Sequence, residues 1–455
     1  MPEVQGSRTG GDRPPQDEGA GRAIAQYIEH NFDRFLSDLR RLCRQESVSA
    51  QGRGLQEAAE LLAELMRASG IEVSVHPVPG GPPVVMGEVE GRSPEALVFY
   101  NHYDVQPPEP LDAWEVPPYA AELRAGRLVA RGAADNKGCL VARIQAVEAL
   151  LRTRGELPIT VKFVVEGEEE IGSPHLAGFL AAHRARFRAG GGLWEAGMRD
   201  RQGRPLVYLG AKGICYLELE ARGSGPERHS ALAPLVENPA WRLVQALSGL
   251  RDKEGRVLVP GFYDAVVLPS GEDLEMVRAI PYDPEEWRDE LGLDEVPAEA
   301  DSPEFFRRYL FEPTCTICGL SSGYSGPGAK TVLPSRAVAK LDFRLVPDQE
   351  PAQVEAAVRA HLAQKGFGDL LVSSHSNQEP ARTPPSAAVV RAVRAAALRV
   401  YGQEPVLYPT MAGSGPLALF VKRLGVPMAS VGVGHSGSGS HGPNENIRLE
   451  DYRLG

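Results

Sequence analysis

The stretch LVFYNHYD, residues 97–104, decides the class of fold. A continuous run of aliphatic, β-branched and aromatic residues ends at His102, and Asp104 follows two positions later. Such a run predicts a buried strand that carries polar side chains at its carboxyl end. Open α/β sheets hold their ligands at this edge. We therefore expect a sheet with His102 and Asp104 at its functional edge.

Further acidic and imidazole side chains stand next to other apolar runs. They are Asp135 in the segment 130–138, the carboxylates Glu168, Glu169 and Glu170 after the run 159–165, Glu195 after the segment 192–194, and His441 in the turn 436–443. Taken alone, a His-x-Asp pair is more often a hydrogen-bonded surface pair, and three adjacent glutamates are more often a solvated turn. Together, these positions would converge at the carboxyl edge of one sheet. Two imidazoles with several carboxylates suit zinc, manganese or cobalt better than copper or an iron–sulfur cluster.

The order of the apolar patterns predicts an α/β domain. Helical and strand patterns alternate, with helices at 23–43, 55–69 and 138–153 and strands at 71–76, 84–90, 96–100, 159–165 and 206–209. After a region of different pattern, the alternation resumes with helices at 386–401 and 416–424 and a strand at 427–431. His441 therefore belongs to the same predicted domain as His102.

The interrupting region has the pattern of a smaller α+β domain. Two strand-helix-strand units are predicted around a polar, Pro-rich segment that reaches Pro303, with strands at 213–222, 314–320, 337–346 and 370–374 and helices at 238–250 and 351–365. A chain of 455 residues also exceeds a single core. We predict a catalytic domain from 22–212 and 384–455 and an inserted α+β sandwich at 213–383. Residues 1–21 lack an apolar core and are predicted to be a disordered tail rather than a signal peptide.

Composition excludes several classes of protein. The 49 Lys and Arg residues against 60 Asp and Glu residues give a net charge of −11, so we expect no nucleic-acid partner and no anionic membrane surface. No run approaches the roughly 18 apolar residues that a membrane span needs. Five cysteines are an odd number in a chain without a predicted secretory signal, which favours a reducing cytoplasm. Cys315 and Cys318 have C-x-x-C spacing, but a strand would turn them to opposite faces, so we predict a structural role.

Four strings carry a resemblance to a known family: NHYDVQP (101–107), ARGAADNKG (130–138), EGEEEIGS (166–173) and KTVLP (330–334). They resemble the dinuclear zinc metallopeptidases that include cytosolic nonspecific dipeptidase and carnosinase, with acetylornithine deacetylase, succinyl-diaminopimelate desuccinylase and carboxypeptidase G as wider relatives. The resemblance runs from about Ala23 to the C-terminus. It implies a zinc-aminopeptidase-like α/β/α catalytic domain, an inserted lid that is also the dimerisation domain, and two Zn²⁺ per subunit, with Mn²⁺ or Co²⁺ as alternatives. Relatives usually carry a longer helix after the last metal histidine, so we expect either a truncated chain or a domain without that covering helix.

The resemblance assigns roles at the predicted sheet edge. Asp135 would bridge both metals, with His102 and Glu195 on one ion and Glu170 and His441 on the other, although which pair serves which ion stays open. Glu169, free of metal, would be the general base that takes a proton from the water. Asp104 would sit behind His102 and fix its tautomer. From the residues alone, Asp104 could also be a strand-end cap.

The resemblance also assigns binding roles in the lid and in one turn. These residues are His229 in the segment 227–230, Thr331, Arg344 in the segment 341–347, and Gly413, Ser414 and Gly415. They would bind the substrate's carboxylate or the developing oxyanion, with His229 serving the site of the other subunit. Without the resemblance, the sequence favours a structural position in a turn for His229 and a surface ion pair for Arg344. The glycine turn precedes a predicted helix from Pro416, whose N–H groups and dipole would favour a carboxylate.

Three classes of function remain. The leading one is hydrolysis of dipeptides or short peptides by a metal-activated water. The second is an N-acyl amino acid deacylase, a desuccinylase or a carboxypeptidase with the same chemistry, and Glu195 favours it because dipeptidases tend to carry aspartate there. The third is a non-enzymatic binding module, disfavoured because the base and ligand positions all hold competent residues. Chain length and the lid motifs favour the dipeptidase.

Overall fold

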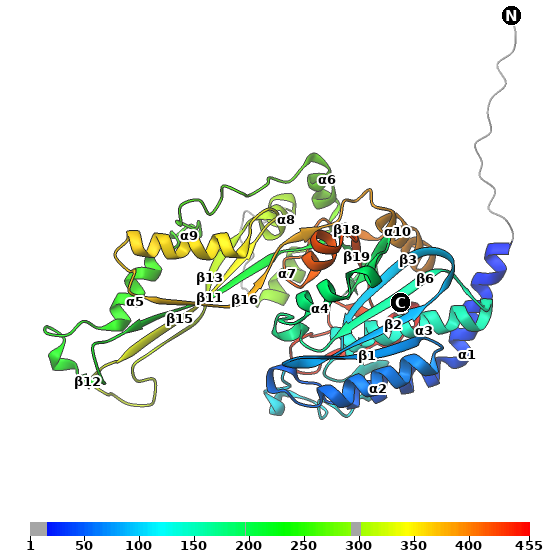
Figure 1. Ribbon diagram of the computed structural model, residues 1–455, viewed down its shortest axis with the longest axis horizontal. Coiled ribbons are helices and arrows are strands. Elements are labelled where there is room, and N and C mark those ends of the chain that lie inside the picture. The colour runs from blue at the N-terminus through cyan, green and yellow to red at the C-terminus, as the bar shows by residue number, and fades with distance from the viewer. Residues whose placement is uncertain (1–15, 196, 293–301) are drawn as a thin grey trace, which may run out of the picture.

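The computed structural model describes residues 16–195, 197–292 and 302–455. Figure 1 shows two parts side by side, a catalytic domain around a large sheet and a smaller inserted lid. No helix of the described residues is long and apolar enough to cross a membrane. The α/β fold class predicted from the sequence is confirmed.

The catalytic domain is built on an eight-stranded mixed sheet. Its strands, from edge to edge, are β1 (Glu72–Val78), β2 (Gly81–Val89), β6 (Leu157–Glu166), β3 (Gly91–His102), β7 (Gly191–Trp194), β19 (Met428–Ser430), β9 (Leu206–Tyr208) and β18 (Val406–Tyr408). β3 pairs parallel with β6 on one side and β7 on the other, and β7 pairs parallel with β19. The carboxyl ends of β6, β3 and β7 therefore meet at one edge of the sheet.

Helices cover both faces of this sheet. One face is covered by α1 (Gln16–Arg44), α2 (Leu55–Ala68), α3 (Gly138–Arg154) and α10 (Ala388–Tyr401), and the other by α4 (Leu176–Ala182) and the helical turn Leu419–Leu424. Alternate residues of β3 pack into the hydrophobic cores on the two faces of the sheet. Phe99 packs with the helices α1 to α3, whereas Val98 and Tyr100 pack on the side of α4. This alternation buries β3 on both faces, which explains its continuous apolar run.

The lid is a four-stranded antiparallel sheet with two helices on one face. It contains β13 (Thr314–Ser322), β15 (Arg336–Leu345), β11 (Gly213–Arg222) and β16 (Leu371–Gln378), with α5 (Pro239–Ser248) and α9 (Pro351–Gln364) packed over a shared apolar core. β12 (Arg228–His229) pairs with β14 (Val332–Leu333) and lies at the end of the lid away from the catalytic sheet (Figure 1). The chain enters and leaves the lid through β10 (Gly210–Ala211) and β17 (Ala381–Arg382), which pair with each other.

Short elements complete the molecule. They are β4 (Glu122–Arg124), β5 (Arg127–Val129), β8 (Met198–Arg199), β20 (Gly434–His435), β21 (Asn446–Arg448), α11 (Leu449–Leu454), and the helical turns Ser49–Gln51, Leu111–Ala113, Ala133–Lys137, Glu169–Ile171, Arg184–Phe187 and Ser230–Leu232. β21 pairs with β5, and β20 pairs with β8. These pairings hold the segment around His441 against the rest of the catalytic domain.

The predicted tail and the predicted Pro-rich segment differ from the structure. The tail was expected to reach residue 21, but α1 begins at Gln16, and residues 1–15 lie outside the described residues. Gly19 and Gly21 each weaken a helix by about 1 kcal/mol relative to alanine. Extending an existing helix through them is still easier than nucleating one, so the packed part of α1 carries the helix back to Gln16.

Three helices lie within and just after the segment predicted to be polar and Pro-rich: α6 (Gly271–Ala279), α7 (Pro284–Leu291) and α8 (Ser302–Phe311). A narrow apolar stripe, which includes Val277, Phe306 and Leu310, packs against Leu206 of β9 and Val406 of β18. The prediction missed these helices because polar residues dominate the sequence around the stripe. This part of the range predicted for the lid therefore lies against the catalytic sheet, whereas the domain boundaries themselves stay a proposal.

Candidate active site

Asp135 lies between two histidines at the carboxyl edge of the large sheet. Its Oδ1 is 3.2 Å from Nε2 of His102, and its Oδ2 is 3.1 Å from Nε2 of His441. His102 ends β3 and is buried, whereas the His441 side chain is 58% exposed. Each oxygen of one carboxylate therefore faces a different imidazole, as a ligand shared between two cations would.

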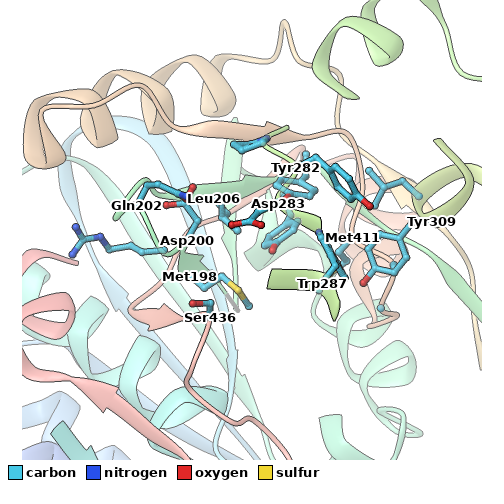
Figure 2. Close-up of a pocket in the computed structure, with 18 residues that line it drawn as sticks. Met198, Asp200, Gln202, Leu206, Tyr282, Asp283, Trp287, Tyr309, Met411 and Ser436 are labelled. Atoms are coloured by element: carbon cyan, nitrogen blue, oxygen red, sulfur yellow. The ribbon is translucent and has the colours of Figure 1, made fainter. Parts of the chain in front are cut away.

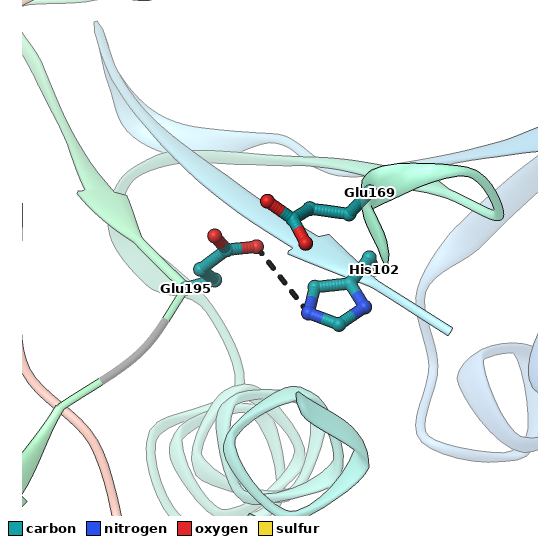
Figure 3. A group of neighbouring side chains, drawn as sticks. All are labelled: His102, Glu169 and Glu195. Carbon is teal, nitrogen blue, oxygen red and sulfur yellow. Dashed lines mark ion pairs between the residues drawn. The ribbon is translucent and has the colours of Figure 1, made fainter. Parts of the chain in front are cut away.

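Three glutamates complete the cluster. Glu195 follows β7, and its Oε2 is 3.6 Å from His102 Nε2 (Figure 3). Glu170 lies on the turn after β6, with Oε2 3.3 Å from His441 Nε2. Ligand atoms of His102, Asp135 and Glu170 lie within 4.8 Å of one another, and so do those of His102, Glu169 and Glu195. The structure thus brings together all six residues that the sequence predicted for the metal ligands and the base.

The donors fit a metal ion. Among the described residues, Glu195 Oε2 is buried and has no hydrogen-bond partner. Burial raises the pKa of Glu195 to about 8, and burial together with the neighbouring Glu195 raises the pKa of Glu169 well above its usual value. Buried carboxylates this close repel each other, and a divalent cation between them would remove that cost. Nitrogen and oxygen donors of this kind suit Zn²⁺, Mn²⁺ or Co²⁺.

Asp104 supports both His102 and the turn that carries the glutamates. Its main-chain oxygen is 3.0 Å from His102 Nδ1, which is closer than its carboxylate at 3.4 Å. The N–H groups of Glu169 and Glu170 donate to the two oxygens of the Asp104 carboxylate, at 3.2 and 3.1 Å. A proton on Nδ1 leaves Nε2 available as a ligand atom. Asp104 therefore orients the imidazole mainly through its main chain and holds the glutamate turn through its side chain.

The sequence analysis missed two groups that hold the ligands in place. The buried carboxylate of Glu445 accepts hydrogen bonds from the backbone N–H groups of Gly132, Ala134 and Asp135 and pairs with Arg131 at 2.9 Å. Arg131 also donates to the main-chain oxygen of His441. The one sequence signal for Glu445 is its place in the string GPNEN (442–446), directly after His441.

The second group is Arg143, a buried arginine on α3. Its guanidinium donates to the main-chain oxygens of Tyr100, Glu195 and Val431, and to the side chain of Asn101. These acceptors stand at or just beyond the ends of β3, β7 and β19. Arg143 therefore ties the three strand ends together beneath the cluster, which its position inside an apolar helix did not reveal.

Comparison with known proteins identifies the family of this chain. Residues 98–455 match the profile of peptidase family M20/M25/M40. The chain belongs to peptidase family M20/M25/M40. Beta-Ala-His dipeptidase of Rattus norvegicus is 29% identical over 97% of this chain and 94% of its own length, and Cys-Gly metallodipeptidase of Schizosaccharomyces pombe is 27% identical over 95% of each. A solved M20 family metallo-carboxypeptidase from Sulfolobus solfataricus is 39% identical, with a TM-score of 0.90 over 92% of this chain and 96% of its own.

The family resemblance stated from the sequence is therefore confirmed, and this peptidase is a metal-dependent hydrolase. The family match covers all six residues of the cluster.

Arg344, on strand β15 of the lid, contacts the glycine turn of the peptidase. Its Nη1 donates to Ser414 Oγ at 2.9 Å, and its Nη2 donates to Asp342 Oδ2 at 3.0 Å. A Cβ added to Gly415 would lie 2.7 Å from the Trp194 ring and 3.5 Å from Glu169 Oε1. The structure thus places Arg344 and the glycine turn beside the cluster. The arginine also makes the ion pair that the residues alone had suggested.

The helix expected directly after the glycine turn begins one residue later than predicted. Helical residues run from 417 to 424, and the part from Leu419 to Leu424 is a π-helix. The start of this helix follows Gly415 by two residues. A carboxylate site at the helix start stays a prediction, and Arg344 and Ser414 are further groups that could bind a carboxylate.

His229 and Thr331 are not brought to the cluster of the same chain. Both are exposed, His229 on β12 and Thr331 just before β14, with His229 Nε2 3.5 Å from Thr331 Oγ1. Figure 1 shows β12 at the end of the lid farthest from the catalytic sheet. Within one chain, His229 therefore cannot act on the same substrate as Glu169.

A cleft leads from the lid to the glutamate turn. A cavity of about 400 Å³ is lined by Ile171, Gly172 and Ser173 after the glutamates, by Gly415 and Pro416, and by residues 375–378 of β16 in the lid. The cavity approaches the cluster at Gly415, whose Cβ position lies 3.5 Å from Glu169 Oε1.

Proposed function

We propose that this peptidase hydrolyses the peptide bond of dipeptides with two divalent metal ions, normally Zn²⁺, held by His102, Asp135, Glu170, Glu195 and His441. The observation that carries the proposal is the Asp135 carboxylate, which faces His102 with one oxygen and His441 with the other. When bound, these ions would supply Lewis acidity and lower the pKa of a water toward about 7. The names of the dipeptidase relatives support the substrate class.

Glu169 is the proposed general base. Its backbone N–H is held by Asp104, and its carboxylate lies near Gly415, at the point where the cleft meets the cluster. The Glu169 carboxylate would take a proton from water and hold it on one oxygen. It would then pass that proton to the nitrogen of the broken amide bond.

Arg344 and Ser414 are the proposed site for the α-carboxylate of the substrate, with Gly413 and Gly415 allowing close approach. A desolvated arginine binds carboxylate through two parallel N–H bonds that a neutral group cannot replace. Asp342 and Ser414 hold the guanidinium in one orientation, which reduces the entropy lost on binding. We therefore expect substrates to need a free carboxylate on the residue after the scissile bond.

We also propose a cytoplasmic homodimer that forms through the lid. His229 and Thr331 lie too far from their own cluster to serve it, so a partner subunit's cluster is the site that they could complete. The five cysteines are all free, and four of them are buried, which suits a reducing compartment.

A substrate panel tests the proposal. The protein is treated with chelator, reloaded with zinc, manganese or cobalt, and assayed with alanyl-phenylalanine and its C-terminal amide. The expected result is hydrolysis of the free dipeptide that disappears on chelation and returns with metal. An enzyme that is fully loaded with metal but hydrolyses no dipeptide contradicts the proposal.

A carboxypeptidase or N-acyl amino acid deacylase is the second candidate, and two observations favour it. The carboxypeptidase from Sulfolobus solfataricus is 39% identical, and position 195 is glutamate, which resembles the carboxypeptidase and deacylase branch. N-acetyl-alanyl-phenylalanine separates the two candidates. A dipeptidase needs the free amine and leaves this blocked peptide intact, whereas a carboxypeptidase removes its phenylalanine.

A further inference from the structure

A second cavity, of about 370 Å³, lies beside the cluster, between helix α7 and the strands β9 and β18 (Figure 2). We call it the aromatic pocket, because five aromatic residues line it. Its ring-bearing residues are Tyr208, Tyr282, Trp287, Tyr309 and Tyr408, and Met198, Met411, Leu206 and Leu310 add apolar surface.

Two chain segments that line the aromatic pocket continue directly from active-site residues. Gly197, which lines the pocket, is two residues after Glu195. Gly413 also lines it and precedes Ser414, to which Arg344 donates. A group in the pocket and a group at the metal cluster could therefore belong to one small molecule.

Two of the three charged residues that line the pocket are paired with opposite charges. Arg199 forms an ion pair with Asp451, and Asp200 forms one with Arg204 at 2.8 Å. Asp283 accepts a hydrogen bond from the backbone N–H of Glu285 at 3.0 Å, at the start of α7. The free energy of binding a neutral aromatic group would come from the rings and the methionines.

The rings are held rigidly. Trp287 packs against Phe305, Phe306 and Tyr309, with ring centroids 4.9, 6.1 and 5.6 Å away. Edge-to-face and offset contacts with such rings stabilise an aromatic guest beyond the area that it buries. Met198 and Met411 are flexible and could adapt to its shape. A volume near the small end of the range for ligand sites, roughly 300 to 1,000 Å³, suits one side chain rather than a longer peptide.

We propose that the aromatic pocket binds one large aromatic side chain of the substrate and so sets the side-chain preference of this peptidase. The proposal rests on the proposed function, because it takes the substrate to be a small peptide at the metal cluster. Helices α7 and α8, whose residues Trp287, Tyr309 and Leu310 line the pocket, are then a specificity element rather than part of the lid.

Two variants and a control test the proposal. Trp287→Ala removes one wall, Met198→Trp fills the pocket without touching the packing of α7, and Trp287→Phe keeps an aromatic wall. The zinc-loaded proteins are assayed with alanyl-alanine, alanyl-phenylalanine, phenylalanyl-alanine, alanyl-lysine and lysyl-alanine. We expect the wild type to favour one phenylalanine peptide over alanyl-alanine by about tenfold or more in kcat/KM. That ratio should fall about tenfold in Trp287→Ala and Met198→Trp and survive in Trp287→Phe.

A binding measurement separates this proposal from the proposed function. Calorimetry gives Kd for N-acetyl-phenylalanine and N-acetyl-alanine in each variant, whether or not any dipeptide is hydrolysed. The proposal is supported if the wild type binds N-acetyl-phenylalanine more tightly than N-acetyl-alanine and if Met198→Trp abolishes this difference. The proposal is overturned if the wild type binds the two compounds equally, or if Met198→Trp leaves the ratio of their Kd values unchanged. A preference for the lysine peptides in the kinetic assay would also overturn it.

Discussion

The carboxylate of Glu445 accepts a hydrogen bond from the backbone N–H of Asp135, at 2.9 Å, although the two residues are 310 positions apart. The same carboxylate also holds Gly132 and Ala134 and is paired with the buried Arg131. His441 is only four residues before Glu445 in the chain. This contact therefore fixes the distance between the segment that carries Asp135 and the segment that carries His441.

The first prediction concerns Glu445→Gln. The variant keeps the shape but removes the charge that three N–H groups and Arg131 require. We expect metal affinity to fall about 10- to 100-fold, as for other groups that orient ligands, and stability to fall by about 3 to 5 kcal/mol because Arg131 loses its buried partner. Chelator competition and denaturant unfolding of the metal-free protein measure both effects. Glu450→Gln, at an exposed position on α11, is the matched control, and equal metal affinity in the two variants would contradict the positioning role.

The sequence predicted the regular part of this fold well because its signals are local. β3 is buried on both faces, so its apolar run could be recognised without any knowledge of its neighbours. The positions of His102 and Glu195 at strand ends then placed them at one edge, since their strands are parallel. The helices α6 to α8 escaped prediction because each offers only a narrow apolar stripe to β9 and β18.

Glu445 and Arg143 show why the rest of the site could not be predicted. Each acts through main-chain groups of segments that are distant in the sequence. Such contacts depend on the register in which those segments pack, and no local pattern encodes that register. For His229, the family resemblance implied a role, but its position at the end of the lid is a tertiary feature that no local pattern predicts.

The second prediction concerns Glu169→Gln. If Glu169 is the base, the variant keeps both metal ions and loses about 10²- to 10⁴-fold in kcat, because an amide cannot accept the proton from water. Metal analysis of the purified variant and a rate measurement are needed together, since Glu169 also stands within ligand distance of His102 and Glu195. Loss of one metal ion would make it a ligand instead, and full activity would remove it from the mechanism.

The third prediction tests the composite site. His229→Ala and Glu169→Gln should each be inactive as homodimers. In a heterodimer, the Glu169→Gln subunit supplies His229 to the intact base of the other subunit. The mixture formed by random assembly should therefore recover about a quarter of the wild-type activity, and heterodimer purified through two affinity tags about half. A verified heterodimer without activity would show that His229 does not act across the dimer.

The fourth prediction is that metal binding releases protons. In the metal-free protein, Asp135 and Glu170 raise the pKa of His441 to about 10, so its imidazole is charged at neutral pH. A metal ion binds only the neutral imidazole, so binding must displace that proton. Affinity should then rise with pH up to about pH 10, by about tenfold per pH unit for each proton released. Calorimetry at pH 7 in two buffers of different ionisation enthalpy counts the protons, and His441→Asn should release about one fewer. Identical heats in both buffers would refute the exchange.

The last prediction concerns which end of the substrate the enzyme recognises. Hydrogen bonds to Ser414 and Asp342 hold the guanidinium of Arg344 and leave an N–H on each terminal nitrogen for a substrate carboxylate. Arg344→Lys keeps the positive charge but loses this fork, so kcat/KM for a dipeptide should fall about 10- to 100-fold. The C-terminal amide of the same dipeptide should be a poor substrate for both proteins, because it lacks the charge that the fork binds. Arg359→Lys, on the exposed side of α9, is the control for a general effect of the substitution. If the wild type cleaves the dipeptide and its amide at comparable kcat/KM, Arg344 does not read the carboxylate, and an aminopeptidase that reads the free amine becomes the better description.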